Sequence, residues 1–302
     1  MGEGQDGFEQ VVQNLPIHLR QKLLTLPEQE REQAEEIRLR VGQPMRVYLA
    51  QEERVLSDSI VWERDLEHAL ELASQASLHL VLPKLRQGYL PLRGGHRMGL
   101  CGSVLWQKGE IQFIRPVFAM NLRIARAKRG IGSAVLPRIC AEGRFQSTLL
   151  LSPPGYGKTT LLRDLICELS NGEGLCVPHR VGLVDERGEL AAMYDGVPQL
   201  EVGVRTDVME GCSKAQGLIM LLRGMNPEIL AVDEITAPED VEALQTAAGC
   251  GVSLLASAHG KDRADLQRRP VYRELLREGI FSKVVYIEVE GGERRYRVED
   301  FV

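Results

Sequence analysis

The chain has 302 residues, of which 44% are hydrophobic, so it is long enough to bury the cores of two ordinary domains. Its 37 Lys and Arg and 42 Asp and Glu residues give a formal net charge of -5 without a block of like charges, which counts against non-specific nucleic-acid binding. The six cysteines include no Cys-x-x-Cys pair, so they suggest neither a zinc site nor a disulfide framework and fit a reducing cytosol. No apolar stretch is long enough to span a bilayer, so we expect any membrane role to depend on a partner protein.

The first part of the chain, residues 1–127, has the pattern of a small α+β domain. Apolar residues at helical spacing predict helices over residues 8–34. Alternating residues then predict a hairpin with strands at 37–41 and 46–49, followed by a helix over 63–82. Between residues 88 and 126, short apolar runs separated by glycines predict strands, with a tight turn at residues 108–109.

The second part, residues 128–302, has a different rhythm. Residues 131–145 predict a helix that leads into this domain. Continuous apolar runs at 148–151, 181–184, 229–232 and 252–256 alternate with helical stretches, which is typical of parallel strands buried on both faces. The pattern predicts a doubly wound α/β domain with a terminal hairpin over residues 283–301.

A phosphate-binding loop follows the first of these apolar runs. Such a loop needs inward-pointing backbone N–H groups, glycines where a Cβ would block them, a lysine for the terminal phosphates and a hydroxyl for Mg²⁺. Gly155, Gly157, Lys158 and Thr159 supply these groups, and the helix that follows favours bound phosphate at its N-terminus. Serine replaces the first glycine of the general pattern, and we expect binding to survive this change. The flanking strand and helix disfavour a glycine-rich turn without a ligand. The sequence therefore predicts ATP and Mg²⁺ as ligands of the loop Ser152, Pro153, Pro154, Gly155, Tyr156, Gly157, Lys158, Thr159 and Thr160.

Two adjacent carboxylates, Asp233 and Glu234, follow the apolar run at 229–232. Phosphoryl transfer to water needs a ligand for Mg²⁺ and a group that polarises the attacking water. We expect Asp233 to share the metal with Thr159 and Glu234 to act on the water. The alternative is an acidic pair at an ordinary helix start.

Two further polar segments, 185–189 and 257–260, follow the runs at 181–184 and 252–256 and would reach the same edge of the sheet. We expect Glu186 to add acid there and His259 to sense the γ-phosphate. A charged loop that caps a helix through Asp185, and a histidine that is merely satisfied by hydrogen bonds, are the alternatives.

Arg123 and Arg126 lie at the predicted junction of the domains. Arginines that stabilise transition-state charge often come from a neighbouring subunit, so these two are candidates for that role. In a continuous strand they would face opposite ways, and only one could reach a given phosphate. The alternative is that both are solvated or interface arginines.

Together these residues resemble the secretion ATPases of the type II and type IV systems, which include pilus motors. The resemblance covers the phosphate loop, an acidic box at 185–189, the segment 222–234 and a histidine box at 255–259. The acidic and histidine boxes differ in detail from the usual family wording. Within that superfamily, residues 36–40, 152–164, 184–190, 203–208 and 247–260 resemble the stage III sporulation protein AA family of endospore-forming bacteria.

The resemblance implies a RecA-like ATPase domain behind a smaller N-terminal domain, assembled as a homo-hexamer. It further implies a cytoplasmic protein, peripheral at the mother-cell side of the forespore septum. There it would energise a trans-envelope channel through contacts with the channel's membrane proteins. Two other functions stay open, a nucleic-acid-dependent ATPase of the RecA type and a nucleotide-gated scaffold. The acidic charge without a basic stripe disfavours the first, and Glu234 disfavours the second.

Overall fold

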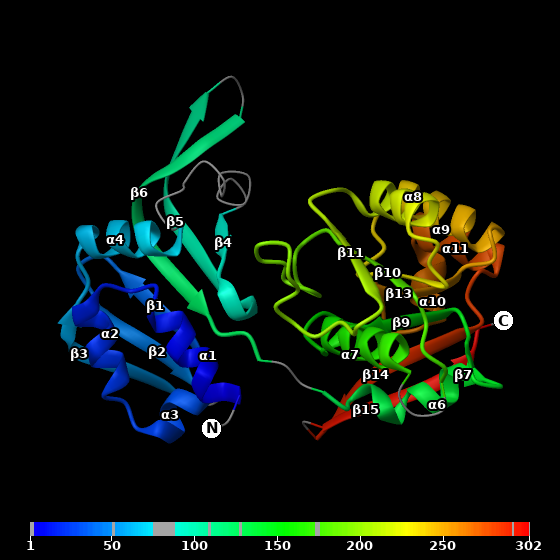
Figure 1. The fold of residues 1–302 in the computed structure, drawn as a ribbon, viewed down its shortest axis with the longest axis horizontal. Coiled ribbons are helices and arrows are strands. Elements are labelled where there is room, and N and C mark those ends of the chain that lie inside the picture. Colours follow the sequence, from blue (N-terminus) through cyan, green and yellow to red (C-terminus); the bar gives the residue numbers. More distant parts are fainter. Residues whose placement is uncertain are drawn as a thin grey trace. The chain divides into compact units, whose positions relative to one another are not determined.

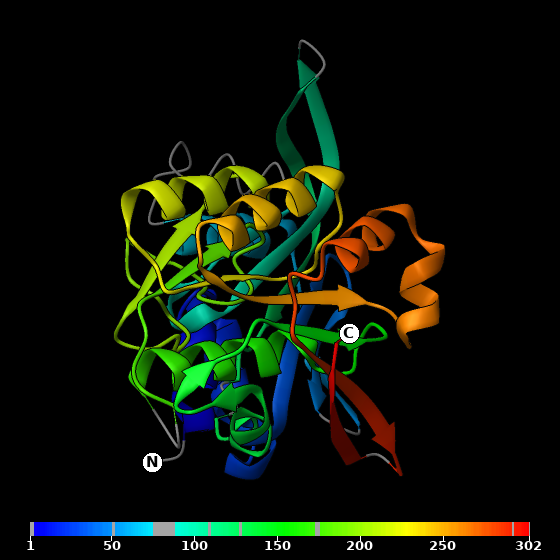
Figure 2. The ribbon, with the colours of Figure 1, turned by 90° about the vertical axis from the view of Figure 1, so that its right-hand side faces the viewer.

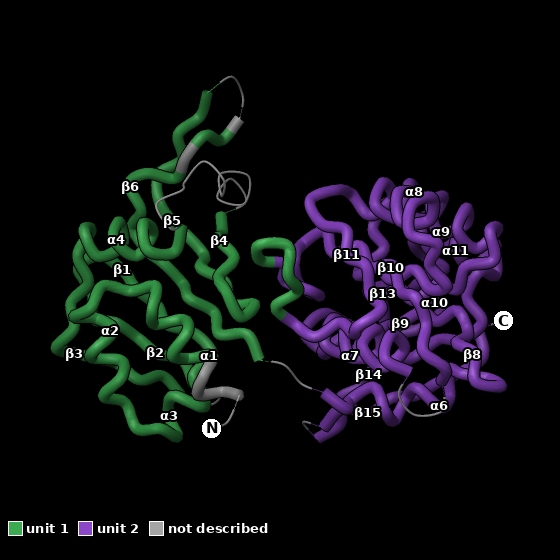
Figure 3. The backbone as a smooth tube through the Cα atoms, viewed as in Figure 1, with its two compact units in different colours: residues 1–126, 194–199 green, residues 127–193, 200–302 purple. Residues whose placement is uncertain are grey.

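The computed structural model describes residues 3–49, 52–74, 88–107, 110–126, 129–172, 176–291 and 293–301. The chain divides into two compact units, residues 1–126 with 194–199 and residues 127–193 with 200–302 (Figure 3). Each unit is built around its own β-sheet (Figure 1). None of the helices in the described part of the chain is long and apolar enough to cross a membrane.

The first unit contains a six-stranded sheet in the order β3-β2-β1-β6-β5-β4, with every neighbouring pair antiparallel. Its strands are β1 (Ala34–Arg40), β2 (Pro44–Leu49), β3 (Glu53–Ile60), β4 (Tyr89–Pro91), β5 (Arg97–Gln107) and β6 (Glu110–Arg123). Its helices are α1 (Glu3–Val12), α2 (Ile17–Leu24), α3 (Glu28–Gln33), α4 (Glu63–Ala73) and the 3₁₀ turn η1 (Arg93–Gly95). The far ends of β5 and β6 extend beyond the other strands as a ribbon (Figure 2).

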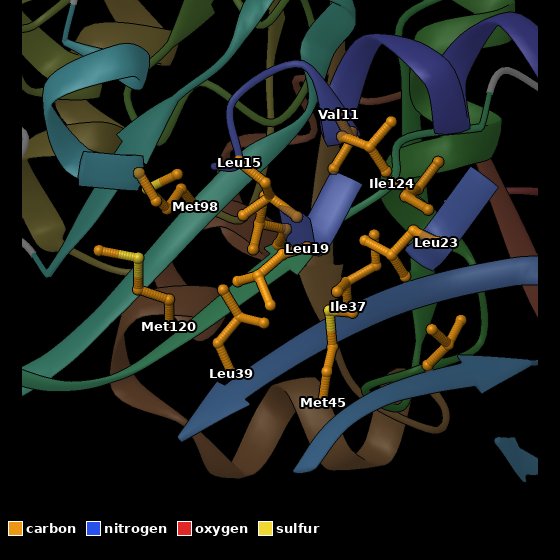
Figure 4. Packing of buried hydrophobic residues seen from close by; sticks show 14 of the residues in the cluster. Val11, Leu15, Leu19, Leu23, Ile37, Leu39, Met45, Met98, Met120 and Ile124 are labelled. Carbon is orange, nitrogen blue, oxygen red and sulfur yellow. The ribbon is translucent and has the colours of Figure 1, made fainter. Parts of the chain in front are cut away.

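One hydrophobic core joins the helices of this unit to one face of its sheet. Side chains on β1 and β2 alternate between buried and partly exposed, so Ile37, Leu39 and Met45 point toward the helices while the residues between them do not. Leu15 and Leu19 pack onto that face from the helical side (Figure 4). The antiparallel sheet is therefore covered by helices on one face.

Most predictions for this unit are confirmed. Three helices occupy the region around residues 8–34, and β1 and β2 form the predicted hairpin, with Ile37 opposite Val47. The helix predicted over 63–82 is α4 in its first part, whereas residues 75–87 and the turn predicted at 108–109 lie outside the described residues.

The second unit contains a seven-stranded sheet in the order β11-β10-β12-β13-β9-β14-β15. All neighbours are parallel except the terminal pair β14 and β15. The strands are β9 (Thr148–Ser152), β10 (Val181–Asp185), β11 (Thr206–Glu210), β12 (Ile229–Val232), β13 (Ser253–His259), β14 (Lys283–Glu290) and β15 (Glu293–Asp300). The four predicted parallel strands and the terminal hairpin are confirmed.

Helices cover both faces of this sheet (Figure 2). One core contains α7 (Lys158–Asn171) and α6 (Leu136–Ile139), whereas the other contains α8 (Lys214–Gly224), α9 (Pro238–Gly249), α10 (Arg263–Arg268) and α11 (Pro270–Glu278). Strands buried on both faces are what continuous apolar runs predict, and the doubly wound α/β class is confirmed.

The helix predicted over residues 131–145 is wrong. The segment forms a 3₁₀ turn η2 (Gly132–Ala134), the short α6, and a small hairpin of β7 (Cys140–Ala141) and β8 (Arg144–Phe145). Glu142 and Gly143 have φ values of 51° and 77°, and a right-handed helix cannot continue through two left-handed residues.

The expectation that no cysteines pair is also wrong. Cys140 and Cys176 form a disulfide, with their Cα atoms 6.4 Å apart. They are 36 residues apart in the sequence, and the packing of the 131–145 segment beside α7 brings them together. Spacing in the sequence carries no signal for such a pair.

Candidate functional site

The predicted site residues of the second unit meet at the carboxyl edge of its parallel sheet. Ser152 at the end of β9 pairs with His259 at the end of β13. Val232, directly before Asp233, pairs with Ala256 on one side and Val184 on the other. Because neighbouring parallel strands end at the same edge, segments far apart in the sequence converge there.

The loop between β9 and α7 has the form that phosphate binding requires. Gly155 and Gly157 have φ values of 82° and 90°, which a side chain would strain, and Gly157 is the residue before α7 begins at Lys158. Ser152 is the last residue of β9 and does not have a positive φ, and its hydroxyl donates to the Pro153 carbonyl at 3.0 Å. Serine in place of the usual first glycine is therefore accommodated without backbone strain.

Asp233 lies at the centre of a cluster of oxygen atoms. The Thr159 hydroxyl donates to its Oδ2 at 2.7 Å, and the Ser257 hydroxyl donates to its Oδ1. A hydroxyl and a carboxylate are hard oxygen ligands that suit Mg²⁺, which also takes ligands from substrate phosphates. The described residues contain no group of three or more His, Cys, Asp and Glu side chains placed to hold a metal, and a metal shared with a nucleotide does not need one.

Glu234 is held in an unusual backbone conformation and between two basic side chains. Its φ is 55°, and the Ser257 hydroxyl accepts its N–H at 2.9 Å. Its Oε2 accepts from Arg187 Nη1 at 2.6 Å, and its Oε1 lies 3.2 Å from His259 Nε2. A left-handed non-glycine residue costs about 1–3 kcal/mol, and such strain is concentrated at functional sites.

Lys158 is buried and lies against the same histidine. Its side chain is 6% exposed, and its Nζ is 2.8 Å from His259 Nδ1. Burial lowers the pKa of Lys158, while the charges of Asp233 and Glu234 act in the opposite direction. An ammonium can only donate, so Nδ1 accepts and the imidazole proton lies on Nε2, facing Glu234. Lys158, His259 and Glu234 thus form one chain of polar contacts.

The two acids of the 185–189 segment have different surroundings. Asp185 is buried, and its carboxylate accepts the backbone N–H groups of Glu189, Leu190, Ala191 and Ala192. Asp185 therefore organises the loop after β10, although no helix begins there for it to cap. Glu186 instead accepts from the buried Lys214 at 2.6 Å.

A small cavity connects this segment to the carboxylates of β12. Its walls include Glu186, Arg187, Lys214, Asp233 and Glu234. Asp240, which caps α9, lies 3.9 Å from Lys214. The structure therefore brings Glu186 to the same cavity as the predicted metal and water ligands.

The two junction arginines belong to the first unit and are not part of this network. Arg123 is exposed at the end of β6 and lies 3.7 Å from Glu36. Arg126 lies beyond the strand and donates to the backbone carbonyls of Glu32 and, at 2.9 Å, Ala34. A role for either arginine in a neighbouring subunit stays a prediction.

Three residues of the network were not singled out from the sequence. Ser257 and His259 are two residues apart in β13 and so share a face, which is a signal that sequence reasoning could have used. Arg187 lies inside the 185–189 segment, in which only the acidic residues were predicted to act. Lys214 is 28 residues from its partner Glu186, at the start of α8, and nothing local marks it.

Comparisons with solved structures identify the fold. The pilus retraction motor PilT with bound ADP is 18% identical to this chain, with a TM-score of 0.63 over 90% of this chain and 81% of that chain. The ATPase DotB of Yersinia pseudotuberculosis is 14% identical, with a TM-score of 0.62 over 95% of this chain and 80% of that chain. At these identities the likeness concerns the fold, which is that of the secretion ATPases.

Comparisons of sequence identify the family. The stage III sporulation protein AA of Bacillus subtilis (strain 168) is 38% identical over 282 residues, 93% of this chain and 91% of that protein. An uncharacterised protein, ycf45 of Cyanidium caldarium, is 30% identical over 163 residues, 53% of this chain and 46% of its own length. The sequence pattern of the sporulation stage III protein AA family matches residues 5–298. The chain therefore belongs to the sporulation stage III protein AA family.

Proposed function

We propose that this chain is a Mg²⁺-dependent ATPase that hydrolyses ATP to ADP and phosphate. The observation that carries the proposal is the contact between the phosphate loop and the strand-end carboxylates, in which Thr159 donates to Asp233 at 2.7 Å. A loop that only bound phosphate would not need a carboxylate at the Thr159 hydroxyl, where Mg²⁺ would bind. In P-loop enzymes this pair holds Mg²⁺, which bridges the phosphates and neutralises developing charge.

The chain's own residues have separable roles in this reaction. The backbone of residues 155–160 and Lys158 would bind the phosphates, while Ser257 keeps Asp233 and Glu234 in place. Glu234 would accept a hydrogen bond from the attacking water and orient it. Arg187 and His259 each contact one oxygen of this carboxylate, so the attacking water would share it with these two partners.

His259 would connect binding of the γ-phosphate to the orientation of water by Glu234. Its Nδ1 accepts from Lys158, so a γ-phosphate that attracts the ammonium competes with the imidazole for it. The histidine then has a free acceptor, and its hold on Glu234 changes. We expect the position of His259, and with it the contact to Glu234, to depend on whether the γ-phosphate is bound.

Two substitutions test hydrolysis directly. We expect Lys158→Ala to weaken ATP binding and abolish turnover, and Glu234→Gln to retain ATP binding while turnover falls by a factor of about 10²–10³. Glu242→Gln, on an exposed position of α9, is the matched control and should behave as the unchanged protein. Equal turnover in all four proteins would rule out this site as the source of hydrolysis.

We further propose that the chain works as a hexameric motor. In this proposal it lies at the cytoplasmic, mother-cell side of the forespore septum and drives a trans-envelope channel by contact with its membrane proteins. Membership of a sporulation family supports the cellular setting. The fold shared with PilT, a pilus retraction motor, supports the kind of work.

The mass of the particle tests assembly. We expect a slowly hydrolysed ATP analogue to shift the protein to hexamers, and a mass that stays monomeric with the analogue would count against the ring.

Sporulation of strains that carry the variants separates a motor from a scaffold that ATP merely orders. A motor requires both Lys158 and Glu234, whereas a scaffold would tolerate Glu234→Gln and fail with Lys158→Ala.

A further inference from the structure

The C-terminal hairpin brings a positive charge to the phosphate loop from the side that the hydrolytic residues leave open. In the sheet, β9 lies between β13, which carries His259, and β14, which pairs with β15. Asp233 and Glu234 follow β12, still farther along the β13 side. Arg294 is the second residue of β15 and approaches the loop from the opposite direction.

Arg294 is in direct contact with the loop backbone. Its Nε donates to the Tyr156 carbonyl at 2.9 Å, although the two residues are 138 positions apart. A Cβ built on Gly157 would lie 2.9 Å from Nε and 3.0 Å from Cζ of this guanidinium. The glycine therefore serves a second purpose besides its positive φ, because its missing side chain leaves space for the arginine.

The remaining donors of Arg294 are available to a ligand. The side chain is exposed, and Nη1 and Nη2 make no hydrogen bond or ion pair with any residue that the structure describes. A guanidinium offers a planar fork of donors that matches phosphate oxygens, and its hydrogen bonds to phosphate are charge-assisted. Lys158, the other cation at the loop, already contacts His259.

We propose that Arg294 is a nucleotide-binding residue, supplied by the C-terminal hairpin of the same subunit. The proposal rests on the ATPase function above and names a residue that holds the nucleotide in place. Since Arg294 lies across β9 from Asp233 and Glu234, it contacts a part of the nucleotide that ATP and ADP share. It therefore contributes to the affinity for both nucleotides and not to the chemical step.

The test measures binding and turnover separately. Arg294→Ala is expected to raise the Kd for a fluorescent ADP and for a slowly hydrolysed ATP analogue roughly tenfold, as loss of a charge-assisted hydrogen bond predicts. The KM for ATP should rise by a similar factor while kcat changes less than about twofold. Arg294→Lys keeps the charge without the fork and should fall between the two.

The neighbouring arginine provides the control. Arg295 is on the same strand, and its partner is Glu290 at 2.5 Å. Adjacent strand residues face opposite ways, so Arg295→Ala should bind both nucleotides as the unchanged protein does. Thermal unfolding of each variant verifies that the hairpin still folds.

Several outcomes would overturn the proposal. Unchanged ADP affinity in Arg294→Ala would do so, and so would a fall in kcat with unchanged binding, which would instead assign the arginine to the chemical step. Failure of the ATPase function has a different signature. If the unchanged protein binds no nucleotide, or binds it equally well after Lys158→Ala, both proposals are lost.

Discussion

The two sheets of the molecule place their charged side chains in different ways. On β1 of the antiparallel sheet, Glu36, Arg38 and Arg40 alternate with buried apolar residues, so charge is spread along one open face. In the parallel sheet, helices cover both faces, and β10 and β12 are buried throughout. In these two strands the charged groups are confined to the carboxyl ends and to the residues that follow.

This difference bears on why the candidate site lies in the second unit. Glu36 contacts Arg38 and Arg123, whose side chains are 37% and 67% exposed, so these ion pairs contribute little to stability. Near the edge of the parallel sheet, by contrast, Lys158, Asp185 and Lys214 are buried. Hydrogen bonds there are stronger and unpaired groups cost more. A carboxylate therefore has a larger effect at the strand ends than on the open face.

Removing one carboxylate from each sheet should make the contrast measurable. Asp185→Ala leaves four backbone N–H groups, three of them buried, without their acceptor, so we expect it to destabilise the second unit by about 3–5 kcal/mol. Glu36→Ala on the open face should cost less than about 1 kcal/mol. Denaturant unfolding measures both.

Hydrogen exchange localises the first effect. The amides of residues 189–192 should exchange much faster in Asp185→Ala, while amides in β1 and β2 keep their protection. Equal losses for Asp185→Ala and Glu36→Ala would contradict the comparison.

His96 is a buried exception in the antiparallel unit and gives a test by pH. Burial lowers the pKa of His96 from 6.5 to about 4, and its Nδ1 accepts the Ala125 N–H at 2.9 Å. The unfolded chain takes up the proton first as the pH falls, so stability is complete above about 6.5 and declines toward pH 4. A shift of this size corresponds to up to about 3 kcal/mol across that window.

His96→Asn separates this proton from the carboxylates that titrate in the same range. Asparagine can still accept the Ala125 N–H but does not titrate. Above pH 6.5 the unfolding free energies of the two proteins should change with pH in parallel. Below pH 6.5 the protein with His96 should lose stability faster than His96→Asn. Parallel curves over the whole range would mean that His96 does not carry the pH dependence.

Local pattern was sufficient for most of the fold. Alternation in β1 and β2 and continuous apolar runs in β9, β10, β12 and β13 follow directly from which faces are buried. The edge strands β3 and β11 lack both patterns because they are largely exposed or only partly buried. The helix prediction over residues 131–145 was wrong for another reason. A left-handed turn at residues 142–143 interrupts an apolar pattern that has helical spacing.

The candidate site was predictable where its residues follow strands. Asp233, Glu234 and His259 lie at strand ends, Lys158 begins the helix after β9, and the parallel topology brings them together. The roles assigned to them stay predictions. Residues that depend on three-dimensional packing left no such signal, and Arg294 is the clearest case, since it reaches Tyr156 only through the pairing of β14 with β9.

Lys214→Met tests whether charge pairing near the strand ends stabilises the protein as a buried ion pair does. Lys214 is buried between Glu186 at 2.6 Å and Asp240 at 3.9 Å. Lys214→Met leaves two carboxylates without their cation, but Glu186 is partly exposed, so we expect a loss of only about 1–2 kcal/mol.

Turnover supplies a second measurement for Lys214→Met. If Glu186 takes part in hydrolysis, kcat should fall, and the double variant Lys214→Met with Glu186→Gln should be no worse than the poorer single variant. Additive effects of the two changes would mean that lysine and glutamate act independently.

The smallest effects are expected at the two arginines of the first unit, where stability and activity can be separated. Arg126→Ala removes hydrogen bonds to the Ala34 and Glu32 carbonyls and should cost about 1 kcal/mol, whereas Arg123→Ala loses one exposed ion pair and should cost less than about 0.5 kcal/mol.

An arginine that acts in trans contributes a factor of about 10³ or more to turnover. If Arg123 has this role, Arg123→Ala should abolish turnover in the assembled protein and leave nucleotide affinity and stability unchanged. Mixing Arg123→Ala with Lys158→Ala subunits then restores part of the activity, because each supplies what the other lacks. Full activity of Arg123→Ala alone would mean that Arg123 has no part in hydrolysis.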